Sequence, residues 1–508
     1  MNFFNEMQKE LNNAKSVTTN GAIAYQTSGK KLLDFNFGVS AMRNMIPMDI
    51  ANQFMKVFFE DKKTAIEYLF YLGDIREGLG ERRAFRAGLH YIVHNQTNLA
   101  KAILPLVPYY NRWDSVLVFL DNEKTRKAAV KLIKKQLKED KANMKEKKPI
   151  SLCAKWMPSV NASSTETKRI AQLLCKELNW TERKYRKTLV KLRKYLDVVE
   201  VKMSSKKWDK IDYEAVPSKA NLIYSDAFLK NDKERRSQYL ESLKKGTAKI
   251  NASILNPHEI CYRYRSRQGA FYFDNNKVEI DDTLEALWKA LPNLSVDNTL
   301  VVRDGSGSMT CTNIGNGTTP LDVATALAIY MSEHNTGNWR DKYITFSSNP
   351  KIVDLSNCSN LRDKVFLSLR EADCSNTNIY KTMMLILKTA QSNHMSQKDM
   401  PKMIVICSDM QFDGRYHNLT RSLFDEIAGE FKGAGYKLPR ICFWNLNARL
   451  SSTIPMQQND LGLILVSGFS VQILKMFMSG EIDPYKVLLK TLHSKRYDKV
   501  REAIEGKV

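Results

Sequence analysis

The chain changes its pattern of apolar residues near residue 290, and this change constrains the fold more than any other feature. Beyond it, short apolar runs rich in β-branched residues alternate with windows of helical periodicity. Strands that are apolar throughout and separated by helices are typical of a parallel sheet covered on both faces. We therefore predict a doubly wound α/β domain with strands at 298–302, 342–346, 402–407, 440–444 and 462–466.

The part of the chain before this change shows helical periodicity and no strand alternation. Windows such as 50–75 and 125–140 place apolar residues three and four apart, with glycine-containing breaks between windows. Serial helix pairs joined by short turns favour an α-helical repeat array. Because 508 residues exceed what one hydrophobic core normally serves, we predict two domains, 1–288 and 289–508.

Positive charge is concentrated in one stretch of the helical half. The net charge is +23, and residues 101–250 contain 36 Lys and Arg against 18 Asp and Glu. Such a concentration attracts polyanions through counterion release, so the predicted partner is nucleic acid. The alternative is a solvated, charge-rich helical surface.

Two basic strings carry the predicted RNA contacts. In 181–200, one apolar stripe is formed by Tyr185, Leu189, Leu192 and Leu196, and most basic residues fall off it. The string YRYRSRQ interleaves tyrosines with arginines, a mixture that stacks bases and neutralises phosphates, although aromatic residues of helical proteins also build cores. The predicted contacts are Arg183, Lys184, Arg186, Lys187, Lys191, Arg193, Lys194, Arg263, Arg265 and Arg267.

Oxygen-bearing side chains gather after two of the predicted strands. Ligands of parallel sheets bind at the carboxyl ends of strands, which share one rim. Carboxylates and hydroxyls are ligands for hard cations, so we predict a site for Mg²⁺ or another divalent cation such as Mn²⁺. Thr377, which lies just before another predicted helix, supplies a hydroxyl that its loop could bring to the same rim. The predicted ligands are Asp304, Ser306, Ser308, Thr377 and Asp409.

The spacing DxSxS, with a later Thr and a later Asp, resembles the metal-ion-dependent adhesion site (MIDAS) of von Willebrand factor A domains. The resemblance implies that the hydroxyls coordinate the ion directly, that an aspartate acts through water, and that an acidic group of a partner completes the shell. Arg303 departs from the family, in which an apolar residue is usual before the metal aspartate. A cation there could compete with the ion or gate it.

Many further strings, including YLGDIREGLGER, YYNRWDSVL, LCAKWMPS, VICSDMQFD and LPRICFWNL, are similar to the family called domain of unknown function 2828. Its members resemble the TROVE-module proteins typified by the Ro autoantigen. The resemblance implies a TROVE-type, HEAT-like repeat module at 1–288 and a von Willebrand A-like domain at 289–508. It also implies RNA binding.

Motifs for catalysis are absent from the sequence. It has no phosphate-binding GxxxxGK[ST] loop, no HExxH and no GxSxG elbow. A nuclease that uses the ion as a Lewis acid would need a general base, and none is evident. We therefore expect a non-enzymatic RNA-binding protein, such as a ribonucleoprotein component. The alternative is a protein-interaction scaffold that captures an acidic partner residue through the ion.

Cysteine usage and hydropathy bear on the compartment. The eight cysteines form no CxxC pair, and several lie in apolar strings where a free thiol is expected. No stretch approaches the roughly 18 apolar residues of a membrane span. We expect a soluble, cytoplasmic protein that does not contact membranes.

Overall fold

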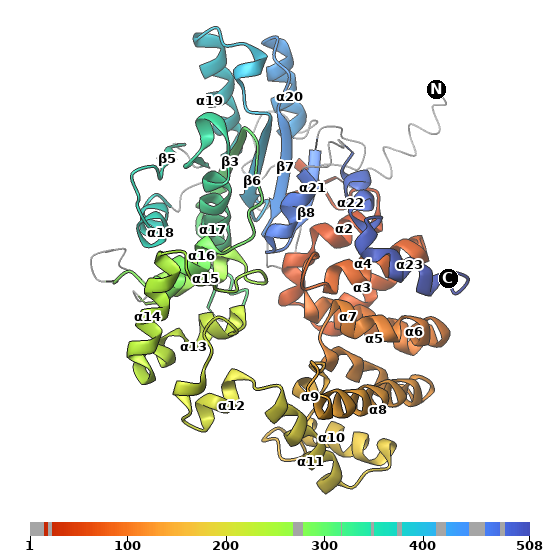
Figure 1. The fold of residues 1–508 in the computed structure, drawn as a ribbon. Coiled ribbons are helices and arrows are strands. Elements are labelled where there is room, and N and C mark those ends of the chain that lie inside the picture. The colour runs from red at the N-terminus through yellow and green to blue at the C-terminus, as the bar shows by residue number, and fades with distance from the viewer. Residues whose placement is uncertain are drawn as a thin grey trace, which may run out of the picture. The chain divides into compact units, whose positions relative to one another are not determined.

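The chain is mostly helical and divides into two compact units (Figure 1). The sheet unit comprises residues 1–49 and 252–493, and the helical unit comprises 50–251 and 494–508. The predicted domains, 1–288 and 289–508, are defined as modules of the sequence, and these boundaries stay a prediction. The computed structural model describes residues 15–18, 23–267, 278–315, 317–346, 350–372, 378–412, 423–446, 463–477 and 483–508.

Helices of the helical unit pack against helices close to them in sequence. The helix α4 (Lys62–Gly73) packs against α5 (Arg82–Asn95), and α8 (Glu123–Lys145) contacts both α10 (Thr165–Leu178) and α11 (Glu182–Tyr195). This packing agrees with the predicted serial helices. The other helices are α3 (Pro47–Glu60), α6 (Thr97–Ile103), α7 (Val107–Tyr110), α9 (Cys153–Trp156), α12 (Val199–Ser204), α13 (Ser218–Asn231), α14 (Lys233–Lys244) and α23 (Asp498–Ile504).

Helix α11 forms where its periodicity predicts it. Its N-cap is Thr181, whose side chain accepts a hydrogen bond from the backbone N–H of Lys184 at 3.2 Å. Such a cap satisfies one of the N–H groups that the first helical turn leaves unpaired. Three residues of the predicted apolar stripe, Tyr185, Leu189 and Leu192, are buried, and most basic residues lie on the outer faces. The fourth, Leu196, is the C-cap of the helix and is only partly buried.

The last residues of the chain belong to the helical unit, where α23 contacts α4 and α6. The guanidinium of Arg496 donates to both carboxylate oxygens of Asp74, at 2.8 and 2.9 Å. Arg501 pairs with Glu67 at 3.2 Å. Because both carboxylates are fully buried, these arginines supply charges that the interior of the unit needs.

Six strands form the sheet of the sheet unit, in the order β5-β4-β3-β6-β7-β8. The chain winds outward from β3 to β5 and then returns to β6 and winds the other way, which is the order of a doubly wound sheet. All residues of β3 and β6 are buried, so both faces are covered as predicted. The strands are β3 (Thr299–Asp304), β4 (Lys342–Phe346), β5 (Ile352–Asp354), β6 (Met403–Ser408), β7 (Arg440–Asn445) and β8 (Leu463–Ser467).

Two strand predictions need correction. The sheet is mixed rather than parallel, because the unpredicted edge strand β5 runs antiparallel to β4. The prediction of a mostly helical part before residue 290 also missed two short strands, β1 (Lys15–Val17) and β2 (Ile23–Tyr25), which form an antiparallel pair. Strands of three residues are too short to produce a recognisable alternation.

Helices of the sheet unit cover the strands. The helix α17 (Pro320–Glu333) contacts β3, β4 and β6, and α2 (Lys31–Phe37) and α22 (Pro484–Leu492) contact β8. The others are α15 (Pro257–Ser266), α16 (Asp282–Lys289), α18 (Leu361–Arg370), α19 (Ile379–Ser392), α20 (Leu423–Gly433) and α21 (Leu474–Phe477).

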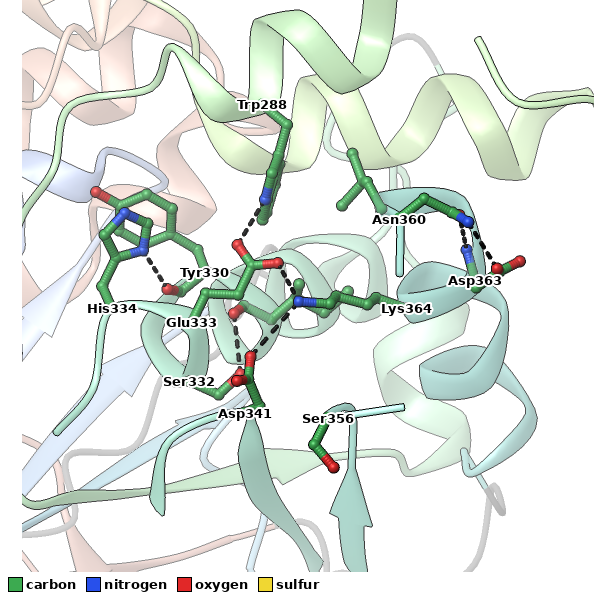
Figure 2. A network of polar contacts seen from close by, with 12 residues as sticks. Trp288, Tyr330, Ser332, Glu333, His334, Asp341, Ser356, Asn360, Asp363 and Lys364 are labelled. Atoms are coloured by element: carbon green, nitrogen blue, oxygen red, sulfur yellow. Dashed lines mark hydrogen bonds and ion pairs between the residues drawn. The ribbon is translucent and has the colours of Figure 1, made fainter. Parts of the chain in front are cut away.

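A polar network fixes this helical cover at the end of α17 (Figure 2). The carboxylate of Glu333 accepts from Trp288 Nε1 at 2.6 Å and from Lys364 Nζ at 2.8 Å. Lys364 also pairs with Asp341 at 3.5 Å. Because these residues come from α16, α17, α18 and the segment before β4, the network ties three helices to the sheet.

Candidate metal centre and nucleic-acid interface

The end of β3 brings three predicted metal ligands together. Asp304 is fully buried, and its Oδ1 accepts a hydrogen bond from the backbone N–H of Ser306 at 2.8 Å. The hydroxyl oxygens of Ser306 and Ser308 are 3.0 Å apart. Adjacent ligands of an octahedral Mg²⁺ with bonds of ~2.1 Å are also about 3 Å apart. The two hydroxyls therefore fit one hard cation.

The end of β6 adds a second carboxylate nearby. Asp409 is 3% exposed, and the next residue, Met410, has a left-handed backbone with φ of 64°. Burial and the neighbouring charge of Asp409 raise the pKa of Asp304 to about 7. Two buried carboxylates that repel each other are stabilised by a divalent cation between them, because the ion favours both charged forms. This donor set, with oxygen atoms alone, fits Mg²⁺ or Mn²⁺.

One further ligand, Thr377, was predicted from the sequence, whereas Ser408, which contacts Asp304, was missed. Thr377, the fifth predicted ligand, lies outside the described residues. Ser408 was missed, yet its hydroxyl donates to Asp304 Oδ2 at 2.6 Å. Its position directly before Asp409, at the end of an apolar run, could have indicated it. Within the described ranges, no group of three or more His, Cys, Asp or Glu side chains could hold a metal ion.

Gly305, directly after the aspartate, lies where the first loop closely approaches a neighbouring segment. A Cβ at this position would lie 3.3 Å from Cα of Ala372, in the segment that follows α18. The close approach holds the first loop against this neighbouring segment. A side chain at Gly305 would push the two segments apart.

Arg303 has a role that the sequence did not predict. Its guanidinium is fully buried and donates to the carbonyl oxygens of Ser368 at 2.6 Å and Glu371 at 3.0 Å. These carbonyls lie at the C-terminal end of α18, where unpaired acceptors and the helix dipole favour a cation. The charge of Arg303 is therefore used at the end of α18, and its competition with the ion stays a prediction.

The predicted basic face of α11 lines a groove of about 440 Å³ in the helical unit. Four of the predicted contacts, Arg183, Lys184, Lys187 and Lys191, line it together with Thr181 and Thr188. Lys141 of α8 supplies a fifth cation that the prediction missed. The groove thus collects five positive side chains and two hydroxyls from two helices. Lys194, also predicted, is exposed near the end of α11 but does not line the groove.

Two predicted contacts on α11 face elsewhere. Arg186 lines a second, smaller pocket beside the helix. Arg193 donates to the carbonyl oxygens of Ala154 and Met157 and to the hydroxyl of Ser159, at 2.6 to 2.8 Å. Because all three nitrogens of its guanidinium donate to the protein, Arg193 holds a loop and is unsuited to binding phosphate.

Two predicted contacts in the sheet unit, Arg265 in α15 and Arg267 directly after it, are paired with carboxylates. Arg265 forms an ion pair with Asp322 and donates to the carbonyl of Gly317 at 2.8 Å. Arg267 pairs with Asp281 at 2.8 Å. Tyr264, expected to stack on bases, is fully buried. The structure therefore gives Arg265, Arg267 and Tyr264 roles in packing, whereas Arg263, which is partly exposed, stays a predicted RNA contact.

Sequence families match both halves of the chain. Residues 127–294 match the family described as Domain of unknown function (DUF2828), as the sequence strings predicted. Residues 298–505 match a second one, described as Domain of unknown function (DUF7788), which was not predicted.

Two individual proteins match most of the chain. The uncharacterized protein L728 of Acanthamoeba polyphaga mimivirus is 30% identical over 518 residues, covering 94% of this chain and 87% of that protein. Among solved structures, the crystal structure of the Deinococcus radiodurans RO (RSR) protein matches with a TM-score of 0.41 and 13% identity. That match covers 87% of this chain and 93% of the other. No described helix is long and apolar enough to cross a membrane.

Proposed function

We propose that this chain, which belongs to the same family as the mimivirus protein L728, is a non-enzymatic RNA-binding protein. The observation that carries the proposal is the groove between α8 and α11, where five cations converge. A resemblance of the sequence to TROVE-module proteins supports RNA over other polyanions. The same resemblance supports a HEAT-like repeat module and a von Willebrand A-like domain as its parts.

The groove differs from an ordinary solvated lysine surface in the arrangement of its charges. Its cations come from separate helices and face one hollow, which concentrates the positive potential. Among the described residues, no carboxylate lies within ion-pair distance of Lys141, Arg183, Lys184, Lys187 or Lys191. Lys135 does pair with Glu139, but other lysines of α8, such as Lys131 and Lys138, have no carboxylate within ion-pair distance among the described residues, so this property alone does not single out the groove. The groove charges are thus available to a phosphate backbone.

Binding of single-stranded RNA over a salt series tests the proposal. Removing one cation that neutralises a phosphate should reduce the slope of log affinity against log salt by about 0.7. We expect Lys187→Glu with Lys191→Glu to weaken binding and flatten this slope. The matched control is Lys230→Glu with Lys233→Glu, which reverses two exposed lysines elsewhere in the same unit. Equal weakening by both pairs would show that the groove has no special role.

The metal centre supports a second candidate function, capture of an acidic group of a protein partner. Ser308 is only half-buried, so an ion held by Asp304, Ser306 and Ser308 would stay accessible from outside. Ligands that bind only the folded state raise its melting temperature. We expect Mg²⁺ to raise the melting temperature of the natural protein and to leave that of Asp304→Ala unchanged. No rise in the natural protein would exclude a bound ion.

The two functions separate in the presence of a chelator. Binding of RNA through phosphates should persist, whereas capture of a carboxylate through the ion should be abolished. Labelled RNA incubated with Mg²⁺ or Mn²⁺ should stay intact, because we propose no catalytic step. The proposed location is the cytoplasm, and buried free thiols such as Cys407 and Cys442 fit a reducing compartment.

A further inference from the structure

A small pocket of about 160 Å³ lies beside α11 in the helical unit. One wall is the helix itself, with Leu189 and Val190, and the other is the loop that contains Val160 and Asn161. Neither the metal centre nor the cationic groove includes these residues. The pocket is therefore a separate feature of the same helix.

Hydrogen bonds within the protein hold the pocket in shape. Arg193 donates to Ala154 O at 2.8 Å, Met157 O at 2.6 Å and Ser159 Oγ at 2.7 Å. The hydroxyl of Tyr185 donates to Pro158 O at 2.9 Å. Four hydrogen bonds thus fasten the loop to α11. A preformed pocket binds its occupant without first ordering a loop, which lowers the entropic cost of binding.

The walls match a flat ring with polar edges. Val190, which is 55% exposed, and Val160 offer apolar surface, and Leu189, which is only 2% exposed, lies behind them. The amide of Asn161 can donate and accept hydrogen bonds, and the guanidinium of Arg186 can stack on a base. Pockets for drug-sized ligands usually exceed about 300 Å³, so this volume suits one ring system only.

The pocket and the groove lie on opposite sides of the exposed ridge of α11. With about 3.6 residues per turn, Arg183, Lys187 and Lys191 project on one side, and Arg186 and Leu189 project on the other. A strand whose phosphates follow the groove needs to cross only one helix, about 10 Å wide, to reach the pocket. We propose that the pocket receives one unstacked nucleobase of the RNA strand bound in the groove, an inference that rests on the proposed function.

The test compares RNA with a ligand that has phosphates but no bases. The probes are a mixed-sequence single-stranded RNA of about 12 nucleotides and an inorganic polyphosphate of similar charge, at one salt concentration. We expect the natural protein to bind the RNA about tenfold more tightly, as one stacked base can contribute. Val190→Phe fills the pocket and should remove this preference while leaving polyphosphate binding and the salt slope unchanged.

The control is Val201→Phe, which places the same ring at another exposed valine of the helical unit. It should bind both probes like the natural protein. Asn161→Ala, which leaves the apolar walls intact, should reduce the RNA preference in part. The inference is overturned if the natural protein shows no preference, or if Val190→Phe and Asn161→Ala both keep it. Reversing the charges of Lys187 and Lys191 should abolish polyphosphate binding, and this result depends on the groove alone. The proposal about the groove and the proposal about the pocket can therefore fail separately.

Discussion

At the scale of single residues, adjacent positions of one strand serve different purposes. Successive side chains of a strand point to opposite faces, so Arg303 and Asp304 are directed apart although they are neighbours in sequence. Asp304 and Asp409 could be placed on one rim from sequence, because both follow parallel strands. The partners of Arg303 could not, because α18 lies more than sixty residues away in the chain.

Arg303→Met should therefore destabilise the protein without affecting the ion. The change removes hydrogen bonds from a charged donor to Ser368 O and Glu371 O in a buried site, so we expect unfolding to become easier by about 2 to 4 kcal/mol. The rise in melting temperature with Mg²⁺ should persist. Urea titration with and without Mg²⁺ measures both effects. A stronger ion response in Arg303→Met than in the natural protein would support the gating interpretation.

The pairing of Asp114 in the helical unit should make stability depend on pH. Burial raises the pKa of this carboxyl, but hydrogen bonds and charges of Arg112 and Arg86 outweigh burial and hold the pKa below its usual range. A lowered pKa stabilises the fold above the unfolded pKa of about 3.9, and this contribution disappears as pH falls through the folded pKa. Asp114→Asn should be less stable by about 1 to 3 kcal/mol at pH 7.

This difference between Asp114→Asn and the natural protein should shrink as the pH falls from about 5 to 3. Denaturation by urea at several pH values measures it. The exposed pair of Glu166 and Arg169 offers a control, since Glu166→Gln should change stability little at any pH. A difference that does not vary with pH would mean that Asp114 acts through packing rather than charge.

At the scale of elements, periodicity predicts a helix and its buried face, but not its neighbours. The stripe that contains Tyr185, Leu189 and Leu192 placed α11 and its inner side correctly. Lys141, on the facing helix α8, could not be assigned to the groove, because nothing in the local pattern says which helices pack together. Short elements such as β5 could not be predicted at all, because three residues are too few to show a periodic pattern.

The N-cap of α11 connects helix formation to the proposed function. Thr181→Ala removes the acceptor for the N–H of Lys184 and should cost about 1 kcal/mol in the first turn, which carries Arg183 and Lys184. RNA affinity should fall by up to about fivefold, because the cations are then less ordered. Ser164→Ala is the matched control, since it removes the same type of cap from α10. A fluorescence anisotropy titration in which both variants bind equally weakly would contradict the prediction.

At the scale of the whole molecule, the change of pattern near residue 290 predicted the sheet unit, yet the compact units interleave along the chain. Residues 494–508 belong to the helical unit, and Arg496 meets Asp74 more than four hundred residues earlier. A sequence pattern records local periodicity, and such a distant ion pair leaves no local signal. The carboxylates of Glu67 in α4 and of Asp74 directly after it are buried, and this burial shows why they need the cations of the C-terminal segment as partners.

The C-terminal segment should therefore control the stability of the helical unit in particular. Arg496→Met leaves Asp74 buried without its cation, and breaking a buried pair by removing one partner costs about 3 to 5 kcal/mol. Hydrogen exchange in the full chain should then accelerate in α4 and α6, which α23 contacts, and not in β3 or β6. Lys495→Met, at the exposed neighbouring position, should leave exchange unchanged. Faster exchange throughout the sheet unit as well would mean that the two units unfold together, because opening of the helical unit alone cannot expose the amides of β3.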